Sequence, residues 1–148
     1  MQKKPSDDDV LVRANAIMRR MVEAKLSLIT AESCTGGLIC AILAQTDGAG
    51  RALQGGFAVY TKEQKSMSLG IPGSLLQEVG SVAPDVAHRM AEGALARSSA
   101  DLALALTGVM GPAEDEDGNP VGRMIYACGA RERIVVEVCE FDEMDPEK

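Results

Sequence analysis

The sequence predicts an α/β fold: a three-layer α/β/α sandwich with a mixed sheet, in a single domain. Three observations lead to this prediction. Short apolar runs alternate with segments of helical periodicity through the first two-thirds of the chain. Two β-rich segments near the C-terminal end are separated by a short turn, which is typical of a hairpin closing the sheet. Finally, 148 residues suit one hydrophobic core, with helices covering both faces of a partly parallel sheet.

The first predicted helix begins after Ser6, whose hydroxyl can accept a hydrogen bond from a free N–H group of the first turn. Residues 7–9 are all Asp, which suits the positive end of the helix dipole. Apolar positions then recur at helical spacing and predict one core-facing stripe, formed by Val10, Ala14, Ile17, Met18, Met21 and Val22.

The remaining elements follow from turn residues and apolar runs. Strands are expected at 26–30, 57–60, 101–106, about 121–129 and about 133–140. Further helices are expected at about 35–46, 62–69, 74–79 and from Pro84 onward. Proline suits the first position of a helix, although Ala83 before it offers no capping side chain. The buried face of that helix is expected to contain Val86, Ala87, Met90, Ala91, Ala94 and Leu95.

Composition excludes several classes of function. The net charge is −7 and the chain has no Trp, whereas nucleic-acid binders normally present a basic surface and aromatic platforms. No apolar run has the roughly 20 residues of a membrane span, and the N-terminal segment lacks the apolar part of a signal peptide. We therefore expect a cytoplasmic protein without nucleic-acid or membrane partners. The scattered cysteines are expected to be reduced: Cys34, Cys40, Cys128 and Cys139.

The most informative segment is 30–37, which reads Thr-Ala-Glu-Ser-Cys-Thr-Gly-Gly between a predicted strand and a predicted helix. Such a turn brings hydroxyl groups and free N–H groups to a helix N-terminus, where negative charge is favoured. Gly36 and Gly37 allow close approach of a ligand to the backbone. An ordinary strand-to-helix connection with Ser and Thr as caps would show the same local pattern.

Three segments together resemble the CinA C-terminal domain family, the nicotinamide-nucleotide amidases (nicotinamide mononucleotide deamidases). They are the octet at 30–37, the segment Gly-Gly-Phe-Ala-Val-Tyr-Thr-Lys-Glu-Gln-Lys at 55–65, and Thr-Gly-Val-Met-Gly-Pro at 107–112. The resemblance covers roughly residues 8–140 and implies the same sandwich fold. It also implies one domain over 1–148, with 1–6 and 142–148 expected to be flexible tails.

The resemblance implies hydrolysis of the carboxamide of nicotinamide mononucleotide to nicotinic acid mononucleotide and ammonia. By matching position, Ser33 would be the nucleophile, with Tyr60 and Lys65 as its activating partners. A buried lysine with a depressed pKa can act as the base that a serine needs to attack an amide. An acyl-enzyme through Ser33 requires no metal and no organic cofactor. The implied substrate-binding residues are Thr35, Gly36, Gly37, Thr107, Gly108 and Gly111.

Other candidate groups have simpler interpretations. Cys34 lacks a histidine base and is interpreted as a packing residue. His88, the only histidine, falls on the polar side of its helix, so Ser/His and Cys/His mechanisms lack their base. The acidic run at 114–117 lacks the ligand spacing of a calcium site and is interpreted as a solvated loop.

The chain also departs from the family pattern and is therefore interpreted as a divergent, C-terminally short member. Lys62 stands where Asn is usual, and Met110 replaces a small residue. At 113–115, Ala-Glu-Asp replaces a glycine-rich stretch, which adds carboxylates that would repel a nucleotide phosphate.

Because the family continues into a closing helix, one sheet face is expected to be bare or covered by a second subunit, as in a homo-oligomer. The alternative to an amidase is a degenerate family member that binds a nucleotide-like ligand or a protein without turnover.

Overall fold

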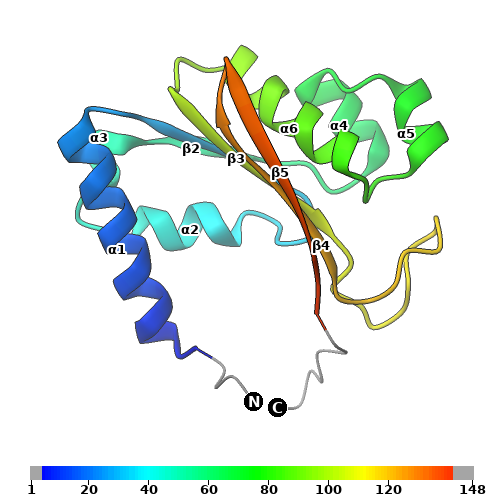
Figure 1. Cartoon of the computed structure of the whole chain (residues 1–148), viewed down its shortest axis with the longest axis horizontal. Coiled ribbons are helices and arrows are strands. Elements are labelled where there is room, and N and C mark those ends of the chain that lie inside the picture. Colours follow the sequence, from blue (N-terminus) through cyan, green and yellow to red (C-terminus); the bar gives the residue numbers. More distant parts are fainter. Residues whose placement is uncertain (1–4, 142–148) are drawn as a thin grey trace.

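A five-stranded mixed sheet forms the centre of the fold, in the order β2-β1-β3-β4-β5 (Figure 1). This computed structural model describes residues 5–141, so of the predicted tails at 1–6 and 142–148 all but residues 5 and 6 lie outside the described residues. Strand β1 pairs in parallel with both β2 and β3, whereas β4 and β5 extend the sheet antiparallel. The strands are β1 (Leu28–Glu32), β2 (Leu53–Ala58), β3 (Leu102–Gly108), β4 (Arg123–Ala130) and β5 (Arg133–Glu140).

Helices lie on both faces of this sheet and complete the three layers (Figure 1). Helices α4, α5 and α6 lie on one side, and α1, α2 and α3 lie on the other. The predicted α/β sandwich with a mixed sheet is therefore confirmed. The helices are α1 (Asp7–Ala24), α2 (Leu38–Ala44), α3 (Ala49–Ala52), α4 (Lys62–Leu69), α5 (Gly73–Val79) and α6 (Pro84–Ala96).

The helix boundaries follow local sequence chemistry. The Ser6 hydroxyl accepts from the Asp9 N–H, and the Asp9 carboxylate accepts from the Ser6 N–H, which is a capping box at the start of α1. Gly70 adopts the left-handed conformation that ends α4. Pro84 occupies the first turn of α6, and Ala83 gives no side-chain cap, as predicted.

The larger hydrophobic core lies between α6 and the sheet. All six positions predicted for the buried face of α6 are buried there. Gly93 of the same helix lets α6 approach α4, because a Cβ at this position would clash with the carbonyl oxygen of Leu69. This close contact fixes α4, and with it Lys65, relative to the sheet.

A smaller core lies on the opposite side and covers only part of the sheet. It joins α1 and α2 to β1 through Ala14, Met18, Met21, Leu28 and Leu43. Ile17, predicted as core, is 54% exposed, so that prediction is wrong.

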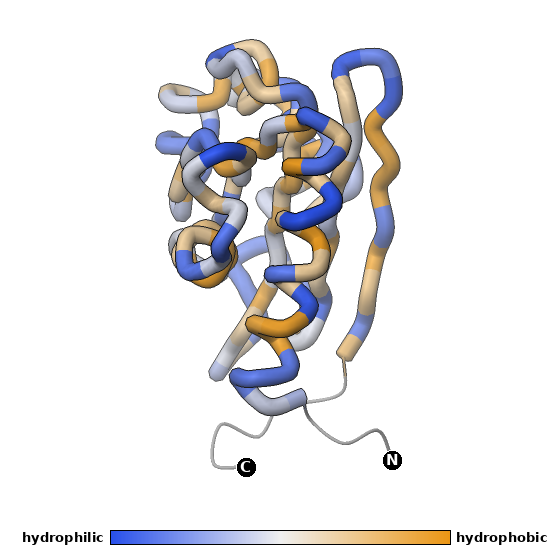
Figure 2. Tube along the Cα trace, turned by 90° about the vertical axis from the view of Figure 1, so that its left-hand side faces the viewer, coloured by the Kyte–Doolittle hydropathy of each residue, from blue (hydrophilic) through white to orange (hydrophobic). Residues whose placement is uncertain are grey.

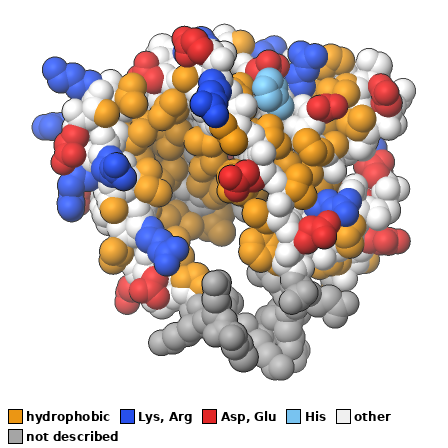
Figure 3. Space-filling view, viewed as in Figure 1, with side chains coloured by type: hydrophobic (Ala, Val, Ile, Leu, Met, Phe, Trp, Pro, Cys, Tyr) orange, Lys and Arg blue, Asp and Glu red, His pale blue; other side chains and the backbone are white. Residues whose placement is uncertain are grey.

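Figure 3 shows hydrophobic side chains gathered in a hollow between α1 and β5, and Figure 2 shows the hydrophobic stretches of β5 along the outer side of the molecule. On this face Cys128 of β4 and Val135 of β5 are exposed. Within residues 5–141, this part of the sheet is bare.

The sequence-based boundaries differ most at β2. The strand was predicted at 57–60 but spans Leu53–Ala58, because Gly55 and Gly56 lie inside it rather than before it. Gly56 is required there, since an added Cβ would clash with the Thr30 hydroxyl of the neighbouring strand. The short helix α3 before β2 was missed, because Ala49–Ala52 contains a glycine and no apolar repeat.

Candidate active site

Ser33 lies directly after β1, at the edge where the parallel strands end. Its N–H group donates to the carbonyl oxygen of Leu106, which ties the turn to the neighbouring strand β3. Gly36 and Gly37 have φ values of 61° and 104°, a left-handed conformation that leads the chain into α2. The predicted turn between strand and helix therefore places a largely buried serine, 6% exposed, beside the core.

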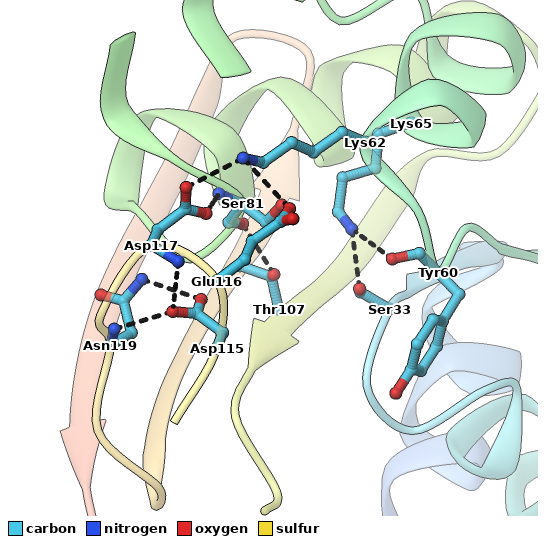
Figure 4. A network of polar contacts seen from close by, with 10 residues as sticks. All are labelled: Ser33, Tyr60, Lys62, Lys65, Ser81, Thr107, Asp115, Glu116, Asp117 and Asn119. Atoms are coloured by element: carbon cyan, nitrogen blue, oxygen red, sulfur yellow. Dashed lines mark hydrogen bonds and ion pairs between the residues drawn. The ribbon is translucent and has the colours of Figure 1, made fainter. Parts of the chain in front are cut away.

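Lys65 comes from α4 and reaches this serine through the protein interior. Its Nζ atom donates to Ser33 Oγ at 2.8 Å and to the backbone carbonyl oxygen of Tyr60 at 3.0 Å (Figure 4). The side chain is completely buried. Although 32 residues separate them along the chain, Ser33 and Lys65 thus form a direct pair.

Burial changes the proton affinity of this lysine. The pKa of Lys65 is lowered from 10.5 to about 8, chiefly by desolvation; Cys34 acts in the opposite direction, and the nearby charge of Lys62 contributes to the lowering. No carboxylate is among these causes. Roughly one-tenth of such a lysine is neutral at pH 7, which is enough to serve as a base.

Tyr60 contributes through its backbone rather than its hydroxyl. The carbonyl oxygen accepts from Lys65, whereas the side chain is 73% exposed and its ring points away from the Ser33–Lys65 pair (Figure 4). Tyr60 also lines the cavity described below. The arrangement holds Lys65 in place with a group that any residue at this position would supply.

Glu32 is the polar residue of this site that sequence analysis did not single out. It is 1% exposed, and its carboxylate accepts from the N–H groups of Ile39 and Cys40 at 2.8 and 3.0 Å. The Thr35 hydroxyl donates to the same carboxylate at 2.7 Å. Glu32 therefore holds the turn closed next to Ser33. The signal available in the sequence was a charged residue at the end of an otherwise apolar strand.

Because of this network, the turn residues predicted to bind substrate lie outside the cavity. The Thr35 hydroxyl is occupied by Glu32, and neither Thr35, Gly36 nor Gly37 lines the cavity next to Ser33. The first N–H groups of α2 already have an anionic partner within the chain. The predicted residues of the other turn do line the cavity: Thr107, Gly108 and Gly111.

A cavity of about 330 Å³ opens beside the Ser33–Lys65 pair. One wall carries the pair together with Cys34 and Tyr60, and the floor is formed by the end of β3. The Thr107 hydroxyl donates to the Ser81 carbonyl oxygen at 2.9 Å, which joins this floor to the loop before α6. The other residues that line the cavity are Ser81, Val82, Gly108, Val109, Met110, Gly111, Ala113, Asp115, Glu116 and Asp117.

The opposite wall is the segment 113–117, which we call the acidic strap. Lys62 of α4 lies 2.9 Å from Asp117 Oδ1 and 3.2 Å from Glu116 Oε1 (Figure 4). The Ser81 N–H donates to Asp117 Oδ2 at 3.1 Å. The run is a loop with exposed Glu114, Glu116 and Asp117, as predicted, but the sequence did not reveal that ion pairing and backbone hydrogen bonds fold it over the cavity.

The remaining candidate groups have structural explanations. His88 is on the surface of α6, 3.5 Å from Glu92. Burial raises the pKa of the Cys34 thiol, which opposes a role as a thiolate nucleophile. Between residues 5 and 141, no cluster of His, Cys, Asp and Glu is arranged to hold a metal ion.

Comparison with known proteins identifies the family. The CinA C-terminal domain matches residues 12–148. The chain belongs to this family. It is 40% identical over 126 residues to a CinA-like protein of Geobacter sulfurreducens, covering 85% of this chain and 30% of that protein. A CinA-like protein of Synechococcus sp. is 39% identical over 135 residues, covering 91% of this chain and 32% of that protein. The chain thus spans about three-tenths of the length of the curated relatives it matches.

Solved structures of the CinA family share the fold. A competence-damaged protein (CinA) superfamily protein from Escherichia coli has a TM-score of 0.87 at 30% identity, covering 96% of this chain and 82% of that chain. The competence/damage inducible protein CihA from Agrobacterium tumefaciens has a TM-score of 0.87 at 34% identity, covering 97% and 87%. In the part of this chain that the structure describes, we find no helix with the length and apolar character to cross a membrane.

Proposed function

We propose that this CinA-family domain is an amidase that hydrolyses the carboxamide of nicotinamide mononucleotide to nicotinic acid mononucleotide and ammonia. The observation that carries the proposal is the buried contact between Lys65 Nζ and Ser33 Oγ, at 2.8 Å. A serine that contacts a lysine with a pKa of about 8, beside a cavity, has the base that it needs to act as a nucleophile. The substrate comes from the family resemblance, and the geometry supports the type of reaction.

The reaction begins with neutral Lys65, which accepts the proton of the Ser33 hydroxyl as Oγ attacks the carboxamide carbon. The resulting oxyanion needs hydrogen-bond donors. Cys34, which follows Ser33, lines the cavity, and its N–H group donates to no oxygen atom of the described residues, so this group is suited to the task. Protonated Lys65 then returns the proton to the departing nitrogen, which leaves as ammonia. Water attacks the acyl-enzyme with Lys65 again as the base, which releases the carboxylic acid and restores Ser33.

The test is to incubate the purified protein with nicotinamide mononucleotide and to measure ammonia and nicotinic acid mononucleotide. We expect Ser33→Ala to abolish release of both products. Ser74→Ala, at an exposed serine of α5, is the matched control and is expected to retain full activity. Release that persists in Ser33→Ala would contradict the serine mechanism.

No release from folded protein would favour the alternative, a degenerate family member that binds a nucleotide-like ligand or a protein. The feature that favours this alternative is the acidic strap, which places carboxylates where a phosphate would have to enter. Isothermal titration with nicotinamide mononucleotide separates the two, because a binding module would bind it without turnover.

The proposal includes a homo-oligomer in which a second copy covers the bare sheet face between α1 and β5. Its support is the gathering of hydrophobic side chains in that hollow (Figure 3). Sedimentation analysis tests it, and a monomer at all concentrations would contradict it. A cytoplasmic location stays a prediction.

A further inference from the structure

Two features that set this sequence apart from its family pattern meet in the structure. Lys62 and the acidic strap are more than 50 residues apart along the chain, yet they form one ion-paired group at the cavity (Figure 4). Lys62 lies one helical turn before Lys65 on α4, so the same helix supplies the lysine beside Ser33 and the lysine that binds the strap. The cavity is therefore bounded by the Ser33–Lys65 pair on one side and by carboxylates on the other.

The strap is held at several points, so its charges keep fixed positions. Lys62 binds Asp117 and Glu116, and the Ser81 N–H binds Asp117 from the other side. Asp115 accepts from the Asn119 N–H at 2.7 Å and from the Asn119 side-chain amide at 2.9 Å. The Lys62 ammonium holds the pKa of Asp117 below its usual value, and Asp117 raises the pKa of Lys62. These groups are charged at neutral pH.

The balance of charge at the cavity is negative. Asp115, Glu116 and Asp117 all line it, and Lys62 compensates one of these three carboxylates. Asp115 is bonded to amide groups, with no cation beside it in the described residues. Lys65, on the opposite wall, is mostly protonated at pH 7 and loses its charge only when it acts as the base, so the three carboxylates still outnumber the two lysines.

When the carboxamide of a substrate lies at Ser33, the part of the substrate remote from the carboxamide lies next to the acidic strap. The cavity of about 330 Å³ is at the small end of the range for ligand sites, about 300–1,000 Å³, so both walls face the same bound molecule. A phosphate dianion next to Asp115 and Glu116 is repelled, whereas the cationic pyridinium ring of a nicotinamide ribonucleoside is attracted.

We infer that the acidic strap makes this site selective for phosphate-free pyridinium carboxamides over their nucleotides, with Glu116 and Asp115 as specificity-determining residues. The inference rests on the proposed amidase function. The preferred substrate is then nicotinamide riboside rather than nicotinamide mononucleotide. Glu116 is the most direct position to test, because its side chain is 72% exposed and its removal leaves the Lys62–Asp117 pair in place.

The experiment compares kcat/KM for nicotinamide riboside and nicotinamide mononucleotide in the wild type, Glu116→Gln and Glu114→Gln. Glu114 is the matched control, since it is an exposed glutamate of the same strap that does not line the cavity. We expect the wild type to prefer the riboside and Glu116→Gln to shift the ratio toward the mononucleotide by roughly three- to tenfold. Glu114→Gln should shift it less than about twofold, because an exposed charge outside the cavity is largely screened.

Failure of the inference and failure of the proposed function give different results. If the wild type preferred the mononucleotide, and Glu116→Gln had the same ratio of kcat/KM for the two compounds, the inference would be overturned and the amidase would stand. Serine-independent activity, or none on either compound, would overturn the amidase. In that case the affinities of the two compounds are measured by titration calorimetry in the wild type and in Glu116→Gln. The inference then predicts that the wild type binds the riboside more tightly than the mononucleotide and that Glu116→Gln reduces this preference. If each protein bound the two compounds with the same affinity, the inference would be overturned.

Discussion

Helix α4 carries one lysine into the wall of the cavity and another that binds the acidic strap opposite, and the two lysines behave in opposite ways. Lys65 is buried against Ser33, and desolvation lowers its pKa to about 8. Lys62 is near the surface between Glu116 and Asp117, and its pKa is raised by hydrogen bonding to Asp117. One turn of helix thus separates a lysine that can lose its proton from one that keeps it. Burial lowers the pKa of the one lysine and a neighbouring carboxylate raises the pKa of the other.

The largest expected effect comes from Lys65→Met, which removes the base and retains a buried apolar side chain. We expect kcat/KM to fall by about a thousandfold or more, since serine is a poor nucleophile without its base. Lys62→Met is the matched control one turn away and should retain most of the carboxamide hydrolysis. Equal loss in both variants would contradict the separate roles of the two walls.

Lys65→Met should also be more stable than the wild type. The difference between pKa values of 10.5 and about 8 corresponds to roughly 3 kcal/mol against burying the charged lysine, partly offset by two hydrogen bonds of about 1 kcal/mol each. Because the folded-state pKa is the lower one, this cost is complete below pH 8 and disappears between pH 8 and 10.5. Urea unfolding at pH 7 and pH 10 should show the gain of Lys65→Met shrinking as pH rises.

A smaller loss is expected from Glu32→Gln, which keeps the size of the side chain but turns an amide NH₂ toward backbone N–H donors. The variant should lose about 1–3 kcal/mol of stability, because buried donors are left without an acceptor. Displacement of the turn should lower kcat by roughly ten- to a hundredfold, with a smaller change in KM. Glu23→Gln, at an exposed position of α1, serves as the control and should change neither quantity.

The pH dependence of the wild type is expected to follow Lys65. The rate should rise with pH with a midpoint near pH 8, where half of the base is neutral, and level off about one pH unit higher. In Lys62→Met the midpoint should move upward by a few tenths of a pH unit, because the neighbouring positive charge that lowers the pKa of Lys65 is removed. A midpoint that moves downward would contradict the assigned base.

The smallest effect is expected from Tyr60→Phe. The carbonyl oxygen that accepts from Lys65 remains, and the exposed ring keeps its shape. We expect the midpoint of the pH profile to stay the same and kcat to change by less than about threefold. A large loss would show that the hydroxyl acts directly on the substrate.

Local chemistry explains why much of the fold was predictable from the sequence. The capping box at Ser6, the buried face of α6 and the closure of α4 at Gly70 depend on residues close together in the chain. Ile17 was misplaced because helical spacing identifies a stripe and not the area of sheet available to cover it. The start of β2 was missed because its glycines are required by the neighbouring strand, which periodicity does not reveal.

The residues of the candidate site could be predicted where the family resemblance indicates them. Contacts between residues far apart in the sequence could not be predicted. Ser33 and Lys65 were proposed as partners, and their contact depends on how α6 positions α4. The role of Glu32 depends on donors seven and eight residues further along, which meet it once α2 has formed. The folding of the acidic strap over the cavity depends on Lys62, 55 residues from Asp117, so the sequence showed only a charge run.

The Glu32 carboxylate has a further consequence for how the site meets its ligand. Since the chain supplies its own anion to the first turn of α2, the conformational entropy of residues 33–40 is lost on folding and not on binding. The amides of Ile39 and Cys40 should then exchange slowly with deuterated solvent in the free protein, and ligand should protect them little further. Ser33, the proposed nucleophile, is therefore held in position before a ligand arrives, and we expect the opposite wall to determine which ligand binds.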